Sequence, residues 1–340
     1  MGNKSISKSK LLENYYSENY NILSMLKYDS NNLIFITEDL IYIYDIFEKT
    51  IKLKIEEFSE FKIYNIFKLN NNDLIICLND NSIRIITIDT KNNSYYNHAT
   101  YKEISEKITQ IINIINDKIL LSTDSGNIFV TSQISYSKKF KIENKLIEHK
   151  KSITSLLEIP NNREFISCSS ISQIILVWSS FNFKNQFIFD KINISQFNNS
   201  VSLIKENIFA VAGIEIILIN LTQRKIIKKI NVKYKIDCIL SLNNDEILTG
   251  GIRIFNPNNK KKNKGKTIGI SNKENNYSAL YIWKFNNKNL IKKFKGYILH
   301  EKKSIQMNNL LYFNDIIVFN IKNENIYFWK NEMMNNNLEK

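Results

Sequence analysis

The sequence predicts an all-β protein in which seven four-stranded antiparallel sheets are arranged as the blades of a propeller. Two observations predict it: a short strand signature recurs seven times, and its copies are spaced by about the length of one four-stranded blade. The composition agrees, because 43% of the 340 residues are hydrophobic and 24% are charged, as in a folded chain with a sizeable core.

The signature is an apolar residue, any residue, a second apolar residue and then an aromatic or bulky residue. Its seven copies are Ile41–Tyr44, Ile83–Ile86, Ile128–Thr131, Ile175–Trp178, Ile216–Ile219, Leu280–Trp283 and Ile326–Trp329. Their last residues are 42, 45, 47, 41, 64 and 46 positions apart, and five of these intervals approach the roughly 40 to 45 residues of a blade. All three tryptophans of the chain occupy the last position. We therefore expect each copy to be the third strand of a blade.

A second apolar strand precedes each copy of the signature, mostly after an Asn or Asp. These partner strands are expected at residues 33–37, 74–78, 119–122, 165–169, 208–212, 246–249 and 316–319. The interval of 64 residues contains an Asn-, Lys- and Gly-rich insertion, expected at residues 256–277, that is too polar to form its own core. Residues 252–255 also fit the signature, but that alternative gives less regular intervals of 36 and 74.

Blade four carries the pattern most completely. His149 precedes the expected first strand, a Ser-rich second strand follows, and Trp178 ends the third, 29 residues after the histidine. His300 and Trp329 repeat that distance in blade seven. This pattern resembles the WD40 repeat, and the resemblance covers about residues 20–335.

The resemblance implies that the repeat positions are structural. These positions are Tyr44, Asp45, Ile86, Thr131, His149, Trp178, Ile219, Trp283, His300 and Trp329. The chain departs from the family where Glu148 and Leu299 replace Gly and where Ser179, Lys284 and Lys330 replace Asp. In the family that Asp and the His belong to a buried hydrogen-bond network, so most blades here are expected to rely on strand packing.

The expected organisation is one propeller domain at residues 20–335, with the basic insertion at 256–277 in blade six and a short tail at 336–340. Residues 1–19 form a basic N-terminal tail, and Lys10–Tyr16 is the candidate strand that closes blade seven, because a long unpaired sheet edge invites aggregation. Cys77, Cys168 and Cys238 lack metal-ligand or redox spacing and are expected to be core thiols.

The net charge of +14 lies in one sector of the sequence. Residues 1–220 hold 24 basic and 24 acidic side chains, residues 221–310 hold 20 and 5, and residues 311–340 hold 3 and 4. A focused positive field concentrates acidic partners. The candidate partner-binding residues are Arg253, Lys260, Lys261, Lys262, Lys264 and Lys266.

These features predict a non-catalytic WD40-type scaffold that binds an acidic protein or peptide, within a multiprotein complex, through its top face and the basic sector of blades five to seven. The alternative is a peripheral membrane propeller, recognising phosphoinositide or another anionic lipid, or an RNA-binding propeller. Nucleic acid ranks lower because the basic segment offers only Arg224 and Arg253 and few interleaved aromatics. A solvated basic surface without a dedicated ligand also stays open.

The sequence shows no nucleophile elbow, phosphate loop or metal-binding helix, so we expect no enzymatic activity, no cofactor and no metal site. No stretch has the length and apolarity of a membrane span, and the expected location is the cytoplasm, with the nucleus not excluded. Gly2 is a candidate myristoylation site with an imperfect motif, and Lys4, Lys8 and Lys10 would supply the second signal for peripheral attachment.

Overall fold

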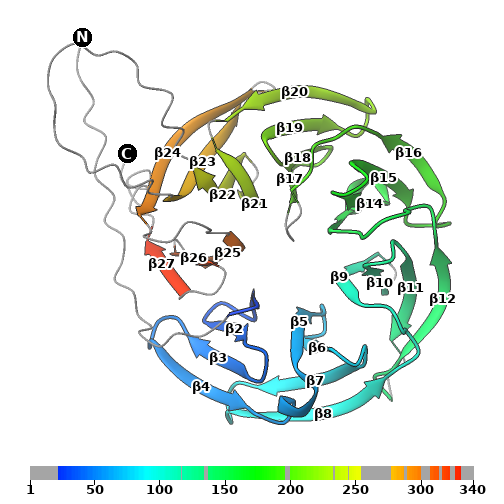
Figure 1. Ribbon diagram of the computed structural model, residues 1–340, viewed down its shortest axis with the longest axis vertical. Coiled ribbons are helices and arrows are strands. Elements are labelled where there is room, and N and C mark those ends of the chain that lie inside the picture. The colour runs from blue at the N-terminus through cyan, green and yellow to red at the C-terminus, as the bar shows by residue number, and fades with distance from the viewer. Residues whose placement is uncertain are drawn as a thin grey trace, which may run out of the picture.

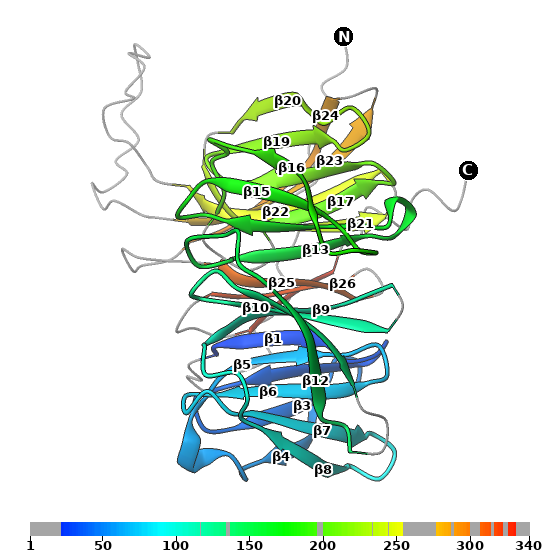
Figure 2. The ribbon, with the colours of Figure 1, turned by 90° about the vertical axis from the view of Figure 1, so that its right-hand side faces the viewer.

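The computed structural model describes residues 22–115, 117–133, 137–195, 200–232, 234–243, 245–253, 277–286, 289–299, 307–313, 316–321 and 326–330. Within them the chain forms seven antiparallel sheets, which are the blades of a ring seen face-on in Figure 1 and edge-on in Figure 2. Six sheets have four strands each, and the seventh has three strands among the described residues. The predicted seven-bladed all-β propeller is confirmed.

Blades one to four follow one another in chain order. Blade one contains β1 (Ser24–Lys27), β2 (Asn32–Ile36), β3 (Ile41–Asp45) and β4 (Thr50–Ile55). Blade two contains β5 (Ile63–Lys68), β6 (Asp73–Leu78), β7 (Ile83–Asp89) and β8 (Ser94–Tyr101). Blade three contains β9 (Ile108–Ile114), β10 (Lys118–Thr123), β11 (Ile128–Gln133) and β12 (Phe140–Leu146). Blade four contains β13 (Ser155–Ile159), β14 (Glu164–Ser169), β15 (Ile174–Ser179) and β16 (Asn185–Phe189).

The remaining blades repeat this order. Blade five contains β17 (Val201–Lys205), β18 (Ile208–Ala212), β19 (Glu215–Asn220) and β20 (Lys225–Asn231). Blade six contains β21 (Lys235–Asn243), β22 (Glu246–Arg253), β23 (Tyr277–Asn286) and β24 (Asn289–Leu299). Blade seven contains β25 (Met307–Phe313), β26 (Ile316–Ile321) and β27 (Ile326–Lys330). Two short 3₁₀ turns, η1 (Ser59–Phe61) and η2 (Pro160–Asn162), join strands.

Every copy of the predicted signature lies in the third strand of its sheet, and every predicted partner strand lies in the second. In blade six the third strand is β23, which contains Trp283, whereas residues 252–253 extend β22. The first strands lie toward the centre of the ring, and β4, β8, β12, β16, β20 and β24 follow its circumference (Figure 1).

The hydrophobic cores lie between adjacent blades. One cluster joins blades four and five through Ile166, Val177, Phe209 and Ile217, all fully buried. Second and third strands are apolar on both faces because each sheet is covered by a blade on either side, whereas every residue of the outer strand β20 is exposed or half-buried. Cys77, Cys168 and Cys238 are buried, unpaired thiols inside these cores, as predicted.

The ring closes through apolar contacts and a hydrogen bond between blades seven and one. One apolar cluster contains Phe35 and Tyr44 of blade one together with Phe319 and Phe328 of blade seven. The rings of Tyr44 and Phe328 have centroids 5.7 Å apart. Lys27 Nζ also donates to the Tyr312 carbonyl at 3.2 Å. The candidate closing strand Lys10–Tyr16 lies outside the described residues.

Candidate functional site

A buried hydrogen-bond chain supports the third strand of blade four. Trp178 Nε1 donates to Ser167 Oγ at 2.8 Å, and His149 Nε2 lies 2.7 Å from the same oxygen. All three side chains are buried, and burial lowers the pKa of His149 to about 4. The histidine is therefore neutral at pH 7, which suits a structural group rather than a proton-transfer group.

Blade six repeats this chain with different residues. Trp283 Nε1 donates to Thr249 Oγ1 at 2.9 Å, and the Tyr234 hydroxyl lies 2.9 Å from the same oxygen. The strand register makes the two sites equivalent, since Ser167 and Thr249 each lie two residues after the residue that faces the tryptophan. Tyr234 thus takes the place of His149. The sequence signal for this bond is a hydroxyl residue, Ser167 or Thr249, two residues after the one that faces the tryptophan. Sequence reasoning missed it.

The other repeat positions serve packing and turns. Tyr44, Ile86, Thr131 and Ile219 are buried in the third strands of their blades. Asp45 does not join a histidine network; its Oδ1 accepts hydrogen bonds from the backbone N–H groups of Phe47 and Glu48, each at 2.9 Å.

Ser179 and Asn220 cap the equivalent turns of blades four and five through their side-chain oxygens. The position that is Asp in the family therefore keeps a capping role after substitution. Trp329 lies in β27, and His300 lies outside the described residues.

Ion pairs link neighbouring blades at the ring's bottom face, the end formed by the turns between first and second strands and between third and fourth strands. Asp73 at the start of β6 accepts from Lys138 Nζ of blade three at 3.1 Å. Glu164 at the start of β14 pairs with Arg224 of blade five. Burial opposes ionisation of Asp73, but bonds from Thr87 and Lys138 prevail and lower its pKa. Asp73 is therefore charged, and the two ion pairs tie successive blades together.

The opposite end is the top face, formed by the loops between second and third strands and by the connections between blades. Arg253, the last residue of β22, lies at this end because β22 is a second strand. The connection from β22 to β23, which contains Lys260, Lys261, Lys262, Lys264 and Lys266, also joins the blade at the top face, but these lysines lie outside the described residues. Gly2 lies outside them as well.

Three isoleucines are exposed at the tips of top-face loops. Ile147 in the connection to blade four is 68% exposed, Ile171 between β14 and β15 is 66% exposed, and Ile214 between β18 and β19 is 61% exposed. The Ile214 loop is held in place, since its backbone N–H donates to Asn193 Oδ1 at 3.2 Å. Solvent-exposed apolar groups presented by fixed loops are typical of a binding surface.

Asp237 on β21 is a buried carboxyl at the junction of blades six and seven. Its side chain is 1% exposed, Oδ2 accepts from the Met307 backbone N–H at 3.3 Å, and Oδ1 is buried without a hydrogen-bond partner among the described residues. Burial is the main cause that raises the pKa of Asp237, to about 6. This carboxyl opposes folding when it is charged.

We predict that Asp237→Asn stabilises the protein at pH 8 by about 1–3 kcal/mol, a gain that disappears by about pH 4. A raised native pKa makes the wild-type acid more protonated in the folded state than in the unfolded state. The stabilisation that the protonated Asp237 carboxyl provides is therefore complete below pH 3.8, the pKa in the unfolded state. It is lost as the pH rises through about 6, the pKa in the folded state. Urea unfolding from pH 4 to 8 measures the difference, with Asp117→Asn as the exposed control. An asparagine variant less stable than wild type at pH 8 contradicts the prediction.

Among the described residues, no group of three or more His, Cys, Asp or Glu side chains could hold a metal ion. Within the same part of the chain, no helix has the length and apolarity needed to cross a membrane.

Comparison of the sequence with family models and with curated proteins gives no match. The structure, in contrast, is similar to a chain in the crystal structure of a mitotic checkpoint complex, with a TM-score of 0.67 and 12% sequence identity. The alignment covers 97% of this chain and 98% of that chain. The chain has the WD40-type propeller fold. The likeness extends around the whole propeller, and at this identity it establishes the fold alone.

Proposed function

We propose that this propeller is a non-catalytic, cytoplasmic protein-interaction scaffold that holds an acidic protein or peptide on its top face, next to the basic sector at residues 221–310. One observation carries the proposal: the exposed isoleucines lie at the same end of the ring as the end of β22 and the start of β23, the two strands that the basic insertion joins. Apolar anchors bordered by charge are the common composition of protein-binding surfaces.

The charge distribution supports an acidic partner. Residues 221–310 hold 20 basic and 5 acidic side chains, whereas residues 1–220 are balanced. On β20, Lys225 and Lys228 are exposed, and Lys229 pairs with Glu215 at 3.5 Å. Such a field speeds encounter with an acidic surface and excludes basic ones, and its reach is about 8 Å at physiological salt.

Charge reversal of the insertion tests this proposal. Changing Lys260, Lys261, Lys262, Lys264 and Lys266 together to Glu is expected to lower recovery of the bound partner by roughly tenfold or more, because like charges then face each other. The measurement is quantitative affinity capture of the tagged chain from its own cells, at 150 mM salt as about the physiological value.

A matched control reverses five exposed lysines of the balanced sector: Lys91, Lys139, Lys141, Lys184 and Lys191. The control should retain the partner. If both variants recover the same partners as wild type, the basic sector does not dock them. If the material lost is lipid vesicle or RNA, with a steep dependence on salt, the membrane or RNA alternative replaces the scaffold.

A further inference from the structure

The outer strand of blade four, β16, has an exposed edge that carries no charge. Three of its five residues are Phe or Ile, and Figure 1 shows the strand on the circumference of the ring, where no other described strand pairs with its outer side. Ile188 on this strand is 52% exposed, and Phe181 in the turn that leads into it is 79% exposed. An uncharged apolar edge is a template for pairing with another strand.

Two exposed charges of opposite sign flank β16 at equal distances from its central residue. Lys184 and Asp190 each lie three positions from Phe187, and neither forms an ion pair with another described residue. In an antiparallel pair of identical strands centred on Phe187, the lysine of each copy faces the aspartate of the other. Gln186 then faces Ile188, and both side chains are exposed. The edge is therefore complementary to itself.

The other outer strands with described side chains lack this property. The charged residues of β4 and β20 are all lysines, so two copies of either strand would bring like charges together. On β12, Glu143 and Lys145 are already paired with Lys118 and Glu106 of the same chain. On β8, two side chains bond to Glu57 of the connection from blade one. Among these strands, β16 alone combines a free edge with a self-complementary charge pattern.

A bulge limits what the backbone of β16 can contribute to such a pairing. Gln186 is an extra residue in the pairing of β16 with β15, since Val177 faces Phe187 and Trp178 faces Asn185. Bulges twist an edge and shorten its regular part. The side chains must therefore supply most of the affinity and fix the register, which predicts a small and weak interface.

We propose that a second copy of this chain docks on the β16 edge and forms an antiparallel, two-fold symmetric dimer centred on Phe187. A two-fold axis makes every contact occur twice, so the dimer has two ion pairs between Lys184 and Asp190 and two contacts between Ile188 and Gln186. Because β16 lies on the circumference of blade four, the top face of each copy stays open. The dimer is therefore independent of the proposed top-face function.

Sedimentation velocity of the purified full chain tests this proposal, at concentrations of roughly 1–100 µM where weak dimers form. Wild type is expected to dimerise in the upper part of this range. Ile188→Lys adds a charge to the apolar edge and should weaken association roughly tenfold or more. Lys184→Asp and Asp190→Lys should each weaken it roughly fivefold or more, because like charges then face each other. Combining these two exchanges restores opposite charges and should restore association.

The matched control is Lys225→Asp on β20. Lys225 is exposed and holds the position in blade five that Lys184 holds in blade four, since Ile219 faces Ile226 as Trp178 faces Asn185. This variant should dimerise as wild type does. All substituted residues are exposed, so melting temperatures close to that of wild type are expected.

Each outcome decides the proposal. Weaker association in the single variants of β16, with recovery in the double exchange, supports both the surface and its register, whatever the result of the top-face charge reversal. The proposal is overturned if wild type stays monomeric at the highest concentration, if the single variants associate as wild type does, or if the double exchange fails to recover association.

Discussion

Trp178→Ala is expected to lower the free energy of unfolding by about 3–5 kcal/mol. The indole is fully buried, its ring is stacked with Phe165 at a centroid distance of 5.8 Å, and its N–H bonds to Ser167. Alanine would leave a cavity between blades three and four and would leave Ser167 Oγ without the indole donor. Equilibrium denaturation followed by circular dichroism measures the loss.

Two further variants separate the loss of the hydrogen bond from the loss of apolar packing and provide an exposed control. Trp178→Phe keeps most of the apolar surface but loses the donor, so it should cost about 1–3 kcal/mol. Phe181→Ala removes a ring that is 79% exposed in the same blade, and its effect should stay within about 0.5 kcal/mol. A Trp178→Ala protein as stable as the Phe181→Ala protein would show that blade four is not packed as described.

Phe328→Ala is expected to cost a similar amount, about 3–5 kcal/mol, because it weakens the junction that closes the ring. Phe328 on β27 is buried, and the centroid of its ring lies 5.7 Å from that of Tyr44 in blade one. Both rings belong to one apolar cluster, so removing Phe328 loosens blade seven against blade one. The same denaturation measurement applies, together with protease susceptibility near residue 320.

The same substitution at an exposed site is the control for ring closure. Phe47→Ala changes a side chain that is 49% exposed on the turn between β3 and β4 and should be nearly neutral. If Phe328→Ala is as mild as Phe47→Ala, the contact between blades seven and one contributes little to stability.

The sequence predicted the frame of the molecule well because each blade repeats one local pattern. Third strands must be apolar on both faces, since a neighbouring blade covers each face, so seven copies of one apolar signature suffice to locate them. The third strand predicted for blade seven is confirmed although Trp329 is not followed by an acidic residue, because packing against the adjacent strand, and not the acidic residue, defines the strand.

The polar details were less accessible to sequence reasoning because they depend on register and on side-chain substitution. Tyr234 replaces a histidine, and Trp283, which bonds to the same Thr249 hydroxyl, lies across the long insertion, so no fixed spacing connects them. Asp45 occupies the position that belongs to a histidine network in the resembled family, but here a turn that needs an acceptor for two N–H groups uses its carboxylate locally.

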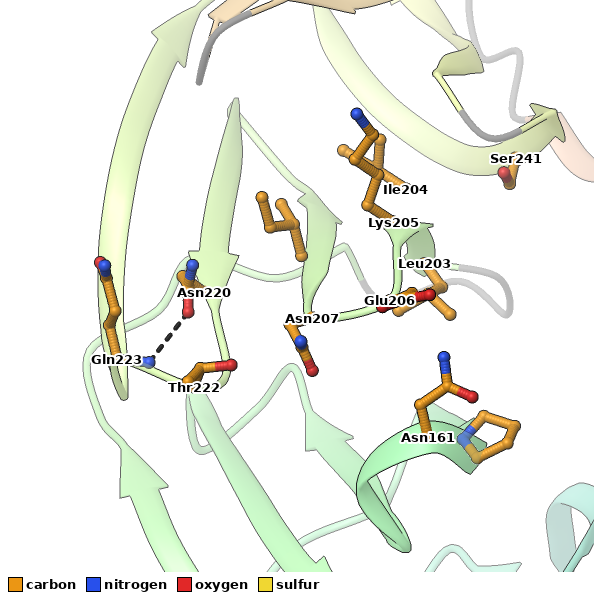
Figure 3. A pocket seen from close by; sticks show the side chains of 12 residues that line it. Asn161, Leu203, Ile204, Lys205, Glu206, Asn207, Asn220, Thr222, Gln223 and Ser241 are labelled. Carbon is orange, nitrogen blue, oxygen red and sulfur yellow. Dashed lines mark hydrogen bonds between the residues drawn. The ribbon is translucent and has the colours of Figure 1, made fainter.

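The hollow that opens at the bottom face of blades four, five and six had no sequence signal (Figure 3). Its walls come from three consecutive blades, and residues as distant as Asn161 and Ser241 line it together only because these blades pack side by side. Sites of this kind follow from tertiary arrangement alone.

An experimental structure of the purified chain tests the ring most directly, since every site above depends on how neighbouring blades meet. We predict seven radial antiparallel sheets, with β1 of blade one beside β25 of blade seven and the indole of Trp178 bonded to Ser167. A different number of sheets, or helix across residues 108–114 or 316–321, would contradict it.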